Sequence, residues 1–490
     1  MESSTKEHAI GGTSRTGGGQ PGGRAERHRR GRSRGGALGL VAAVLMLAVT
    51  PASAAETLQA ALVRAYQTNP VLNAERARQR GTDENVSIAL SGYRPQIELG
   101  LSPSLIALRN LVPGGGTEQA TLRGYTAQLT ITQILFNGFR TGNQVRQAES
   151  QVQSGREALR GVEQSVLLDA VTAYMSVVAN QSLVETQRLN LTFLTETLAT
   201  TRKRLDAGDV TPTDVAQAEA RLARGTADLN AAEVALAISQ ATYEQVIGAP
   251  PGRLALAEPI DRLLPKRRDE AITLARRDNP AIRGAQFDTD VAVYAVKVAE
   301  GALYPTIAVQ GTLASTRNTD TTLGSSGNDQ AALVGSLNLP LYDGGQAAAQ
   351  VRQSKEVLGQ TRIVLDRVRT QTNTAAVAAF VTHEGAKIAV TAAESEVRAA
   401  GIALAGVQRE AQAGQRTTLE VLNSQQDLNA ARTRLILAQR DRVVASYTLL
   451  GTIGRLDHKS LGLTTPSYEP QVHYQQVRDA WHGLRTPDGR

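Results

Sequence analysis

Cysteine is absent from the chain, and aromatic residues are scarce. Among 490 residues there is no Cys and 1 Trp, and aromatic residues make up 3%. The missing cysteines exclude a disulfide framework, a thiolate metal site and a lipid anchor attached to cysteine. So few large rings argue against a compact core of bulky side chains, whereas the abundance of Ala, Gln, Thr, Leu and Arg favours long helices packed through small side chains.

Long apolar runs are also missing. After residue 55, no uninterrupted apolar run reaches the length of about eighteen residues that a transmembrane helix needs. A chain that enters a membrane without such a helix must use β-strands, because only helices and closed barrels satisfy their backbone polar groups inside lipid. If the chain is exported, the membrane it can occupy is therefore the outer membrane.

The positive charge is concentrated near the N-terminus. Residues 1–54 hold eight Lys/Arg and three Asp/Glu, which leaves 45 basic and 43 acidic residues in the remainder of a chain of net charge +7. Basic residues from Arg27 to Arg34 precede an apolar stretch and the small residues Ala52-Ser53-Ala54, which is the order of a secretory signal. We expect a leader over 1–54, cleavage near Ala55, and no nucleic-acid partner for the nearly neutral remainder.

The second half of the sequence repeats the first. The segment 135–138 (Leu-Phe-Asn-Gly) returns at 341–344 as Leu-Tyr-Asp-Gly, and Ala207-Gly208 returns as Ala413-Gly414, both at an offset of 206. Such a duplication predicts one architecture with internal pseudo-twofold symmetry. The expected organisation is a first repeat over 55–260, a second repeat over 261–455 and a C-terminal tail over 456–490.

Long helices are predicted in both repeats. Proline is absent between Gly114 and Thr211 and between Leu341 and Thr465, and apolar residues recur there at steps of three and four. We expect rods over 143–205 and 345–410, each about 95 Å long at 1.5 Å per residue. Glycine-centred turns would end both rods. We also predict returning helices over 213–247 and 418–453 and shorter helices over 57–90 and 269–301. Helix 57–90 would stack end to end with 213–247, and helix 269–301 with 418–453, so that each pair matches the length of one rod.

Four short segments alternate between apolar and polar residues and predict strands. They form two hairpins, 94–136 and 304–342, whose Gly-rich middles, 110–124 and 317–329, read as exposed loops. Such segments suit a transmembrane barrel with lipid on one side and water on the other. An ordinary amphipathic sheet that covers a soluble core is the alternative. Phe136 and Tyr342, at the strand exits, suit either a membrane boundary or packing at the junction between sheet and helix.

Residues in this order resemble the TolC family of outer-membrane efflux and secretion channels. The resemblance covers nearly the whole mature chain and includes the strand exits together with Asp214-Val215 and Glu420-Val421-Leu422 after the two turns. It implies a mainly α fold with a small β part, in which duplicated long-helix hairpins form a periplasmic α-helical barrel. Four strands per protomer would contribute to a trimeric transmembrane β-barrel, since even an eight-stranded barrel is filled by side chains.

The resemblance also implies a gate and a docking site at the periplasmic tip. The family's gating Arg falls on Arg416, its Thr and Asp partners on Thr213 and Asp214, and its inner acidic ring on Glu420 and Asn423. Because Asn423 is uncharged and Ala411 replaces the family's gating Tyr, we expect fewer closing contacts and a less cation-selective constriction. The alternative is that Arg416 and Asp214 are solvated turn charges. The adaptor-docking residues would be Gly208, Asp209, Val210, Gly414, Gln415 and Arg416.

The function implied by the resemblance is a passive outer-membrane exit duct, a channel-tunnel of a tripartite drug-efflux or type I secretion system that crosses periplasm and outer membrane. The expected partners are two further copies in a homotrimer, a periplasmic adaptor (membrane fusion) protein, an inner-membrane RND or ABC transporter, and outer-membrane lipid. A periplasmic coiled-coil adaptor or structural envelope protein is the alternative, but it has no use for four lipid-type strands. The exported substrate is left open.

No arrangement of residues suggests catalysis. Of six histidines, two lie in the leader, His383 lies within a rod, and His458, His473 and His482 lie in the tail. No His, Asp and Glu residues have metal-ligand spacing, and no Ser is framed as a nucleophile. We therefore expect no enzyme activity, no cofactor and no metal site.

Overall fold

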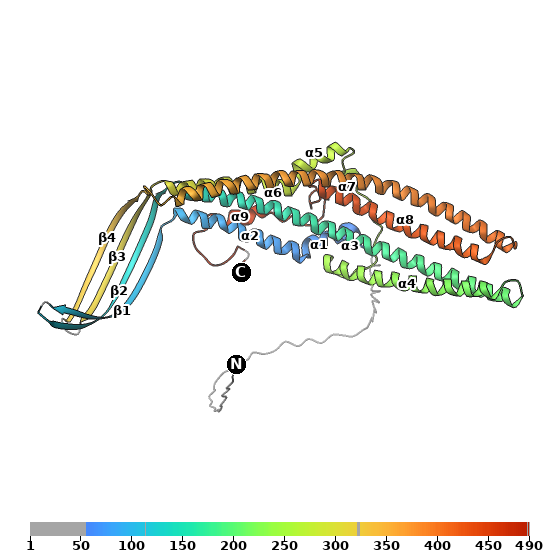
Figure 1. Cartoon of the computed structure of the whole chain (residues 1–490), viewed down its shortest axis with the longest axis horizontal. Helices are drawn as coiled ribbons and strands as arrows, with labels where there is room; N and C mark the ends of the chain where they lie inside the picture. Colours follow the sequence, from blue (N-terminus) through green and yellow to red (C-terminus); the bar gives the residue numbers. More distant parts are fainter. Residues whose placement is uncertain (1–54, 113, 321–323, 488, 490) are drawn as a thin grey trace, which may run out of the picture. The chain divides into compact units, whose positions relative to one another are not determined.

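The computed structural model describes residues 55–112, 114–320, 324–487 and 489. The predicted leader and cleavage site at 1–54 lie outside the described residues. Within the described part, the same order of elements occurs twice: two short helices, a β-hairpin, a long helix and a returning helix (Figure 1). The predicted fold class, mainly helical with a small sheet, is confirmed.

The two rods are single long helices. Helices α3 (Arg140–Asp206) and α7 (Gln346–Gln412) have 67 residues each, about 100 Å at 1.5 Å per residue. In α3 the predicted seam is buried along Ala148, Val152 and Leu159. Among the described residues, α3 is the helix that is long and apolar enough to cross a membrane, but 61% of its apolar window is buried inside the protein, as in a packed core helix.

Each predicted short helix is in fact two helices, so the single spans 57–90 and 269–301 are wrong. The first consists of α1 (Leu58–Thr68) and α2 (Pro70–Leu90), and the second of α5 (Arg268–Asp278) and α6 (Pro280–Glu300). Proline disfavours helical backbone at the residue before it and lacks the N–H that would continue the helix. Asn69 has left the helical region, and its side chain accepts hydrogen bonds from the Val71 and Leu72 N–H groups.

The same asparagines join the short helices to the returning helices. Helix α4 (Pro212–Ile247) ends against α1 and α2, where the Asn69 side-chain amide donates to the Val246 carbonyl at 2.9 Å. In the second repeat, Asn279 donates in the same way to the Thr452 carbonyl at the end of α8 (Thr418–Thr452), also at 2.9 Å. The predicted end-to-end stacking is therefore confirmed, and one asparagine in each repeat both starts a helix and caps another.

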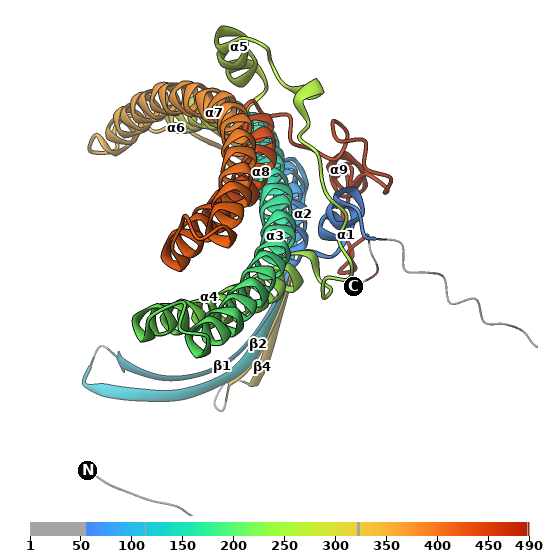
Figure 2. The ribbon, with the colours of Figure 1, turned by 90° about the vertical axis from the view of Figure 1, so that its right-hand side faces the viewer.

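The largest apolar core lies around the middle of α3. Tyr174 is fully buried there, and its hydroxyl lies 2.7 Å from both the Glu56 and the Ala255 carbonyl oxygens, to one of which it donates at a time. Figure 2 shows α3, α4, α7 and α8 side by side, with α1, α5 and α9 outside them. The other large side chains that fill this core are Leu62, Leu72, Leu167, Tyr243, Ile247, Leu449, Leu450, Ile453 and Leu456.

The C-terminal tail packs against the first repeat. Helix α9 (Pro470–Val477) lies on α2, where His473 Nδ1 is 3.1 Å from the fully buried carboxylate of Asp83. Farther along, the Arg94 guanidinium lies over the Trp481 ring at 4.7 Å. The tail histidine and tryptophan therefore hold the tail on the protein surface.

The two hairpins form one antiparallel sheet in the order β1-β2-β3-β4. Its strands are β1 (Gln96–Val112), β2 (Gly116–Asn137), β3 (Thr306–Asp320) and β4 (Gly324–Asn338). The predicted loops 110–124 and 317–329 are wrong, because most of each belongs to the strands. Backbone pairing continues to Val112↔Gly116 and Asp320↔Gly324, and the Arg317–Asp329 ion pair at 2.8 Å connects β3 with β4.

We expect Asn69→Ala to lower the free energy of unfolding by about 1–2 kcal/mol, because it removes a helix cap and a hydrogen bond between helices. Chemical denaturation of the detergent-solubilised protein measures this. Asn279→Ala should have a similar effect in the second repeat.

The matched control is Asn85→Ala on α2, since the Asn85 side chain makes no hydrogen bond within the described part of the chain. Its cost should stay within about 0.5 kcal/mol. Equal losses at Asn69 and Asn85 would show that the junction contacts contribute nothing.

Candidate functional site

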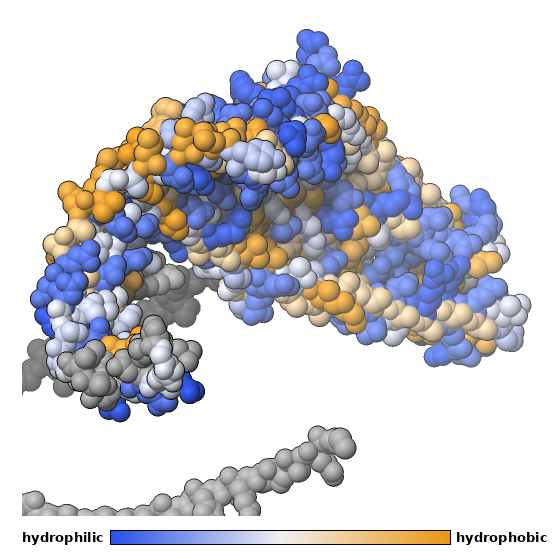
Figure 3. Space-filling model, turned by 60° about the vertical axis from the view of Figure 1, so that its left-hand side comes forward, coloured by the Kyte–Doolittle hydropathy of each residue, from blue (hydrophilic) through white to orange (hydrophobic). Residues whose placement is uncertain are grey.

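One face of the sheet is apolar and uncovered. The register places Leu99 beside Leu129, and Leu129 beside Leu313, so that leucines form a row across three strands. Leu99 and Leu333 are 77% and 79% exposed, and Figure 3 shows apolar side chains gathered over the strands. A sheet that covered a soluble core would bury these side chains. The alternative of an ordinary amphipathic sheet therefore fails.

The opposite face of the sheet is polar. Its rows contain small hydroxyl and amide side chains, and the Thr126 and Thr316 hydroxyls lie 3.3 Å apart. One complete row consists of Ser102, Thr126, Thr316 and Asn328. With one face suited to lipid and the other to water, the sheet has the chemistry of part of a channel wall.

The sheet is open at both edges. Strand β1 pairs only with β2, and β4 pairs only with β3. The outer backbone groups of β1 and β4 therefore have no strand partner within the described chain. Inside a membrane such edges must pair with other strands, because no water is present to accept their hydrogen bonds.

The two aromatic residues at the strand exits have different surroundings. Phe136 is partly buried and packs edge-on against Phe139, with 5.1 Å between ring centroids. Tyr342 is 87% exposed. Phe136 thus packs at the junction between sheet and helix, Tyr342 is largely exposed, and the membrane boundary at both positions stays a prediction.

At the other end of the rods, both predicted glycine turns are present. Gly208 and Gly414 have φ of +83° and +76°, values that L side chains rarely adopt. A Cβ on either glycine would meet no neighbouring atom, so that the backbone conformation, and not close packing, requires glycine. Gly208, Asp209, Gly414, Gln415 and Arg416 are exposed and Val210 is partly so, which leaves the tips accessible.

Asp214, one of the predicted gate residues, stabilises the start of α4. The Asp214 N–H donates to the Thr211 hydroxyl at 3.3 Å, and the Asp214 carboxylate accepts the Thr211 N–H at 2.9 Å, which makes a capping box. The hydrogen bond from the Thr211 N–H, the largest cause, and a second one that the Thr211 hydroxyl donates to the carboxylate at 2.8 Å lower the pKa of Asp214. Thr213 is exposed beside this box.

The second tip contains the same cap and an ion-pair cluster. The Thr417 N–H donates to the Glu420 carboxylate at 2.9 Å, and the Glu420 N–H donates to the Thr417 hydroxyl at 3.3 Å. Arg416 lies between Glu410 and Glu420, at 2.8 Å and 2.7 Å. Within one chain Arg416 is thus paired with glutamates, and its predicted contact with Thr213 and Asp214 is not formed.

A contact that sequence reasoning missed lies behind the tips. The Arg221 guanidinium on α4 donates to the Asn423 side-chain oxygen at 2.9 Å and also to Gln426, both on α8. It joins the two helical hairpins at Asn423, a predicted constriction residue. No local motif marks Arg221, because its partners are more than two hundred residues away in the sequence.

Amide side chains continue this connection along α3 and α8. Gln425 donates to Asn190 at 3.0 Å in a buried position, and Asn429 donates to Gln187 at 3.2 Å. The contact between the two hairpins near the tips therefore combines these amides with a small apolar cluster, in which Leu422 of α8 is buried against Leu194, Leu198 and Ala218 of the first hairpin. It is much smaller than the apolar core in the middle of the rods.

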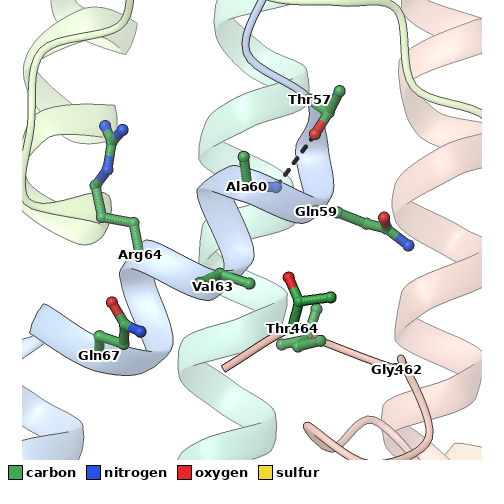
Figure 4. A pocket seen from close by; sticks show the side chains of 9 residues that line it. Thr57, Gln59, Ala60, Val63, Arg64, Gln67, Gly462 and Thr464 are labelled. Carbon is green, nitrogen blue, oxygen red and sulfur yellow. Dashed lines mark hydrogen bonds between the residues drawn. The ribbon is translucent and has the colours of Figure 1, made fainter. Parts of the chain in front are cut away.

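A cavity near the C-terminal tail is a further candidate site. A cavity of about 410 Å³ lies between α1 and the tail, but Arg64 and Gln59 point in different directions, and Thr57 serves to cap α1 (Figure 4). Among the described residues, no group of three or more His, Cys, Asp or Glu residues could hold a metal ion.

Comparisons with known proteins agree over most of the length. The family model described as outer membrane efflux protein matches residues 61–249 and 271–455. The outer membrane efflux protein BepC of Brucella suis is 43% identical over 455 residues, which are 92% of this chain and 98% of that protein. The alkaline protease secretion protein AprF of Pseudomonas aeruginosa is 22% identical, over 72% of this chain and 75% of that protein.

Solved structures share the fold at lower sequence identity. The CmeC outer membrane channel of Campylobacter jejuni matches with a TM-score of 0.71 and 14% identity, over 86% of this chain and 89% of that chain. The outer-membrane channel OprN matches with a TM-score of 0.69 and 17% identity, over 81% and 89%.

We expect acid to loosen the start of α8. The folded tip lowers the pKa of Glu420, first through the Thr417 N–H and then through Arg416 and the Thr417 hydroxyl. A carboxyl with a lowered folded pKa stabilises the folded state above its unfolded value of about 4.3, and this contribution is lost as pH falls through the folded value. The amide-exchange protection factors of residues 417–421 should therefore fall below about pH 4.

Glu420→Gln should lower this protection at neutral pH and remove its dependence on acid. Glu410→Gln, which removes a partner of Arg416 but leaves the capping box intact, should keep the dependence. Unchanged protection of the native tip across this pH range would rule out the capping role.

Proposed function

The chain belongs to the outer membrane efflux protein family, and from that premise we propose how its duct closes, is gated and meets its partners. It is an outer-membrane exit duct of an efflux or secretion system, with a tunnel that extends into the periplasm. Such ducts are not a class of enzyme. The observation that carries the proposals is the open, two-faced sheet joined to two helices of 67 residues.

We propose that three copies close one barrel. Four strands are too few to enclose a lumen, and each copy would pair its β1 edge with the β4 edge of the next. Apolar side chains are also exposed along the outer helices, at Val234 and Ile238 of α4 and at heptad spacing on α7. One copy's α4 would pack on the next copy's α7, a head-to-tail contact that closes into a ring. The exposed residues on α7 are Val381, Ile388 and Ile402.

The alternative function, a periplasmic adaptor or structural envelope protein, does not account for the sheet. Long helices and export would serve either function. Only a membrane-spanning wall gives a reason for exposed apolar side chains on one face of the sheet and hydroxyl side chains on the other.

The proposed gate has contacts within and between copies. Within a copy, Arg221 would hold α8 through Asn423, while Arg416 is anchored by Glu410 and Glu420. Between copies, Arg416 would approach Thr213 and Asp214 of the neighbour, which are exposed or half-exposed at the first tip. Opening then requires the two hairpins to separate near the tips, where water can replace the lost hydrogen bonds and Leu422 would leave its small apolar cluster.

The exposed tips are the proposed docking surface. Both turns are accessible, and their glycines leave open space around the backbone. A periplasmic adaptor would bind at 208–210 and 414–416 and connect the duct to an inner-membrane RND or ABC transporter. The chain itself needs no cofactor in this account, because its partners would supply energy and select the cargo.

We expect Arg221→Gln to raise channel conductance. The substitution removes charge-assisted hydrogen bonds that hold α8 near the tip, so that the open population should increase at least about fivefold. Single-channel recording in planar bilayers measures this.

Arg224→Gln is the matched control, because Arg224 lies on the same helix but its ion-pair contact, at 4.0 Å, is with Asp228 of α4 itself. It should conduct as the native protein does. If both variants conduct equally, Arg221 is no part of the gate.

We expect a photo-crosslinker at Gln415 to capture a periplasmic adaptor in living cells, because Gln415 is exposed at the second tip. Mass spectrometry would identify the captured proteins. An adaptor paired with a proton-driven pump would assign drug efflux, and one paired with an ATP-driven exporter would assign protein secretion.

A crosslinker at Leu256, which is 85% exposed but lies outside the tip turns, provides the control and should not capture the adaptor. Capture at Leu256 with none at Gln415 would refute docking at the tips.

A further inference from the structure

The end of the C-terminal tail exposes two large apolar side chains. After α9, the Trp481 indole is 67% exposed, and the Leu484 side chain is fully exposed. Neither has a role in the proposed gate, in the docking tips or in the pairing of strand edges. In water, both forgo the favourable transfer of apolar surface into an apolar environment.

Hydrogen bonds fix this part of the tail beside the start of the sheet. The Ala480 carbonyl accepts from the Arg94 guanidinium at 2.7 Å and from the Ser87 hydroxyl at 3.2 Å. The same guanidinium lies over the Trp481 ring, 4.7 Å from its centre. Arg94 comes two residues before β1. The indole is therefore held next to the end of the strand at which the two-faced sheet begins.

Other aromatic side chains mark the same level of the molecule. Aromatic residues make up only 3% of the chain. Several that are more than half exposed nevertheless lie within four residues of the helix end of a strand, namely Tyr93, Phe139, Tyr304 and Tyr342. Exposed aromatic rings of membrane proteins gather at the boundary between lipid and water. Their positions predict this boundary at the level of Arg94, and therefore of Trp481.

The tail lies on the side of the helices that faces away from a lumen. Figure 2 shows α9 on the convex side of the curved layer that α3, α4, α7 and α8 form. A ring of three such copies has its lumen on the concave side. The side chains that follow α9 therefore face the surroundings of the duct, which at the level of the first strand residues is the membrane.

We propose that Trp481 and Leu484 enter the inner leaflet of the outer membrane and anchor the tail in phospholipid. The inference rests on the proposed membrane position of the sheet, whose apolar face begins three residues after Arg94 with Ile97. An indole suits this depth, because its ring is apolar while its N–H can remain among the headgroups. Leu484 adds apolar surface at the boundary between headgroups and acyl chains. Through the contacts of the tail with α2, the anchor ties the first repeat to the membrane surface.

Tryptophan fluorescence tests the anchor, because Trp481 is the only tryptophan in the sequence. The full-length protein is reconstituted into phospholipid vesicles whose acyl chains carry bromine either near the headgroup or near the methyl end. We expect bromine near the headgroup to lower the emission at least about twofold relative to unbrominated vesicles, and bromine at the bilayer centre to lower it less. Emission that neither lipid quenches would overturn the proposal, whether water or a neighbouring copy then surrounds the ring.

Nitroxide labels on single cysteines provide the second measurement, and each label is specific because the chain has no Cys of its own. In the same vesicles, a label at Leu484→Cys should collide more often with oxygen, which concentrates in lipid, than with a water-soluble nickel chelate. Val472→Cys on α9 is the matched control, since Val472 is 54% exposed on the same tail. The next residue, His473, contacts Asp83, about eleven residues and therefore about 16 Å before Arg94. The control label should favour the chelate.

A label at Leu99→Cys, on the apolar face of the sheet, separates failure of the anchor from failure of the proposed duct. Contact with lipid at Leu99 together with water at Leu484 would overturn the anchor alone. Water at both positions would overturn the membrane position of the sheet as well.

Discussion

Unpaired strand edges are the constraint on which the rest of the structure depends. Inside lipid, each backbone N–H or carbonyl without a partner costs several kcal/mol, and one copy leaves the outer edges of β1 and β4 open. Its apolar face is exposed at the same time. The chain therefore specifies a wall segment that becomes stable when other copies complete it, and the helices continue that wall because each long helix begins shortly after a strand ends.

The helices are firmly joined in the middle and more loosely joined at the tips. Around Tyr174 the core is large and apolar, and the Asn69 and Asn279 side chains fix the junctions on either side. Near the tips, the hairpins meet through amides, the Arg221 guanidinium and a small apolar cluster around Leu422. Polar contacts exchange readily with water, whereas an apolar core does not. In the proposed account, the smaller contact near the tips is the one that separates when the duct opens.

Much of this architecture could be predicted from the sequence, because helical periodicity and glycine turns can be read from residues that are close together in the sequence. The rods, the turns at Gly208 and Gly414 and the end-to-end stacking were found in this way. The Asn-Pro breaks and the capping boxes of Thr211 and Thr417 were also written in local sequence but were overlooked. The strand lengths and Arg221 had no local signal: pairing partners extend the strands through Gly-rich segments, and the partners of Arg221 are distant in sequence. Contacts between copies, including those proposed for Arg416, cannot appear in a single chain.

The most direct test of this account is the number of chains in the assembled duct. Native mass spectrometry of the full chain, extracted from outer membranes in mild detergent, counts them. Closure of the β1 and β4 edges through further copies predicts a complex of three chains with no stable single chain. A stable, folded single chain would contradict the account, because the open sheet edges and the exposed apolar face would then need no partner.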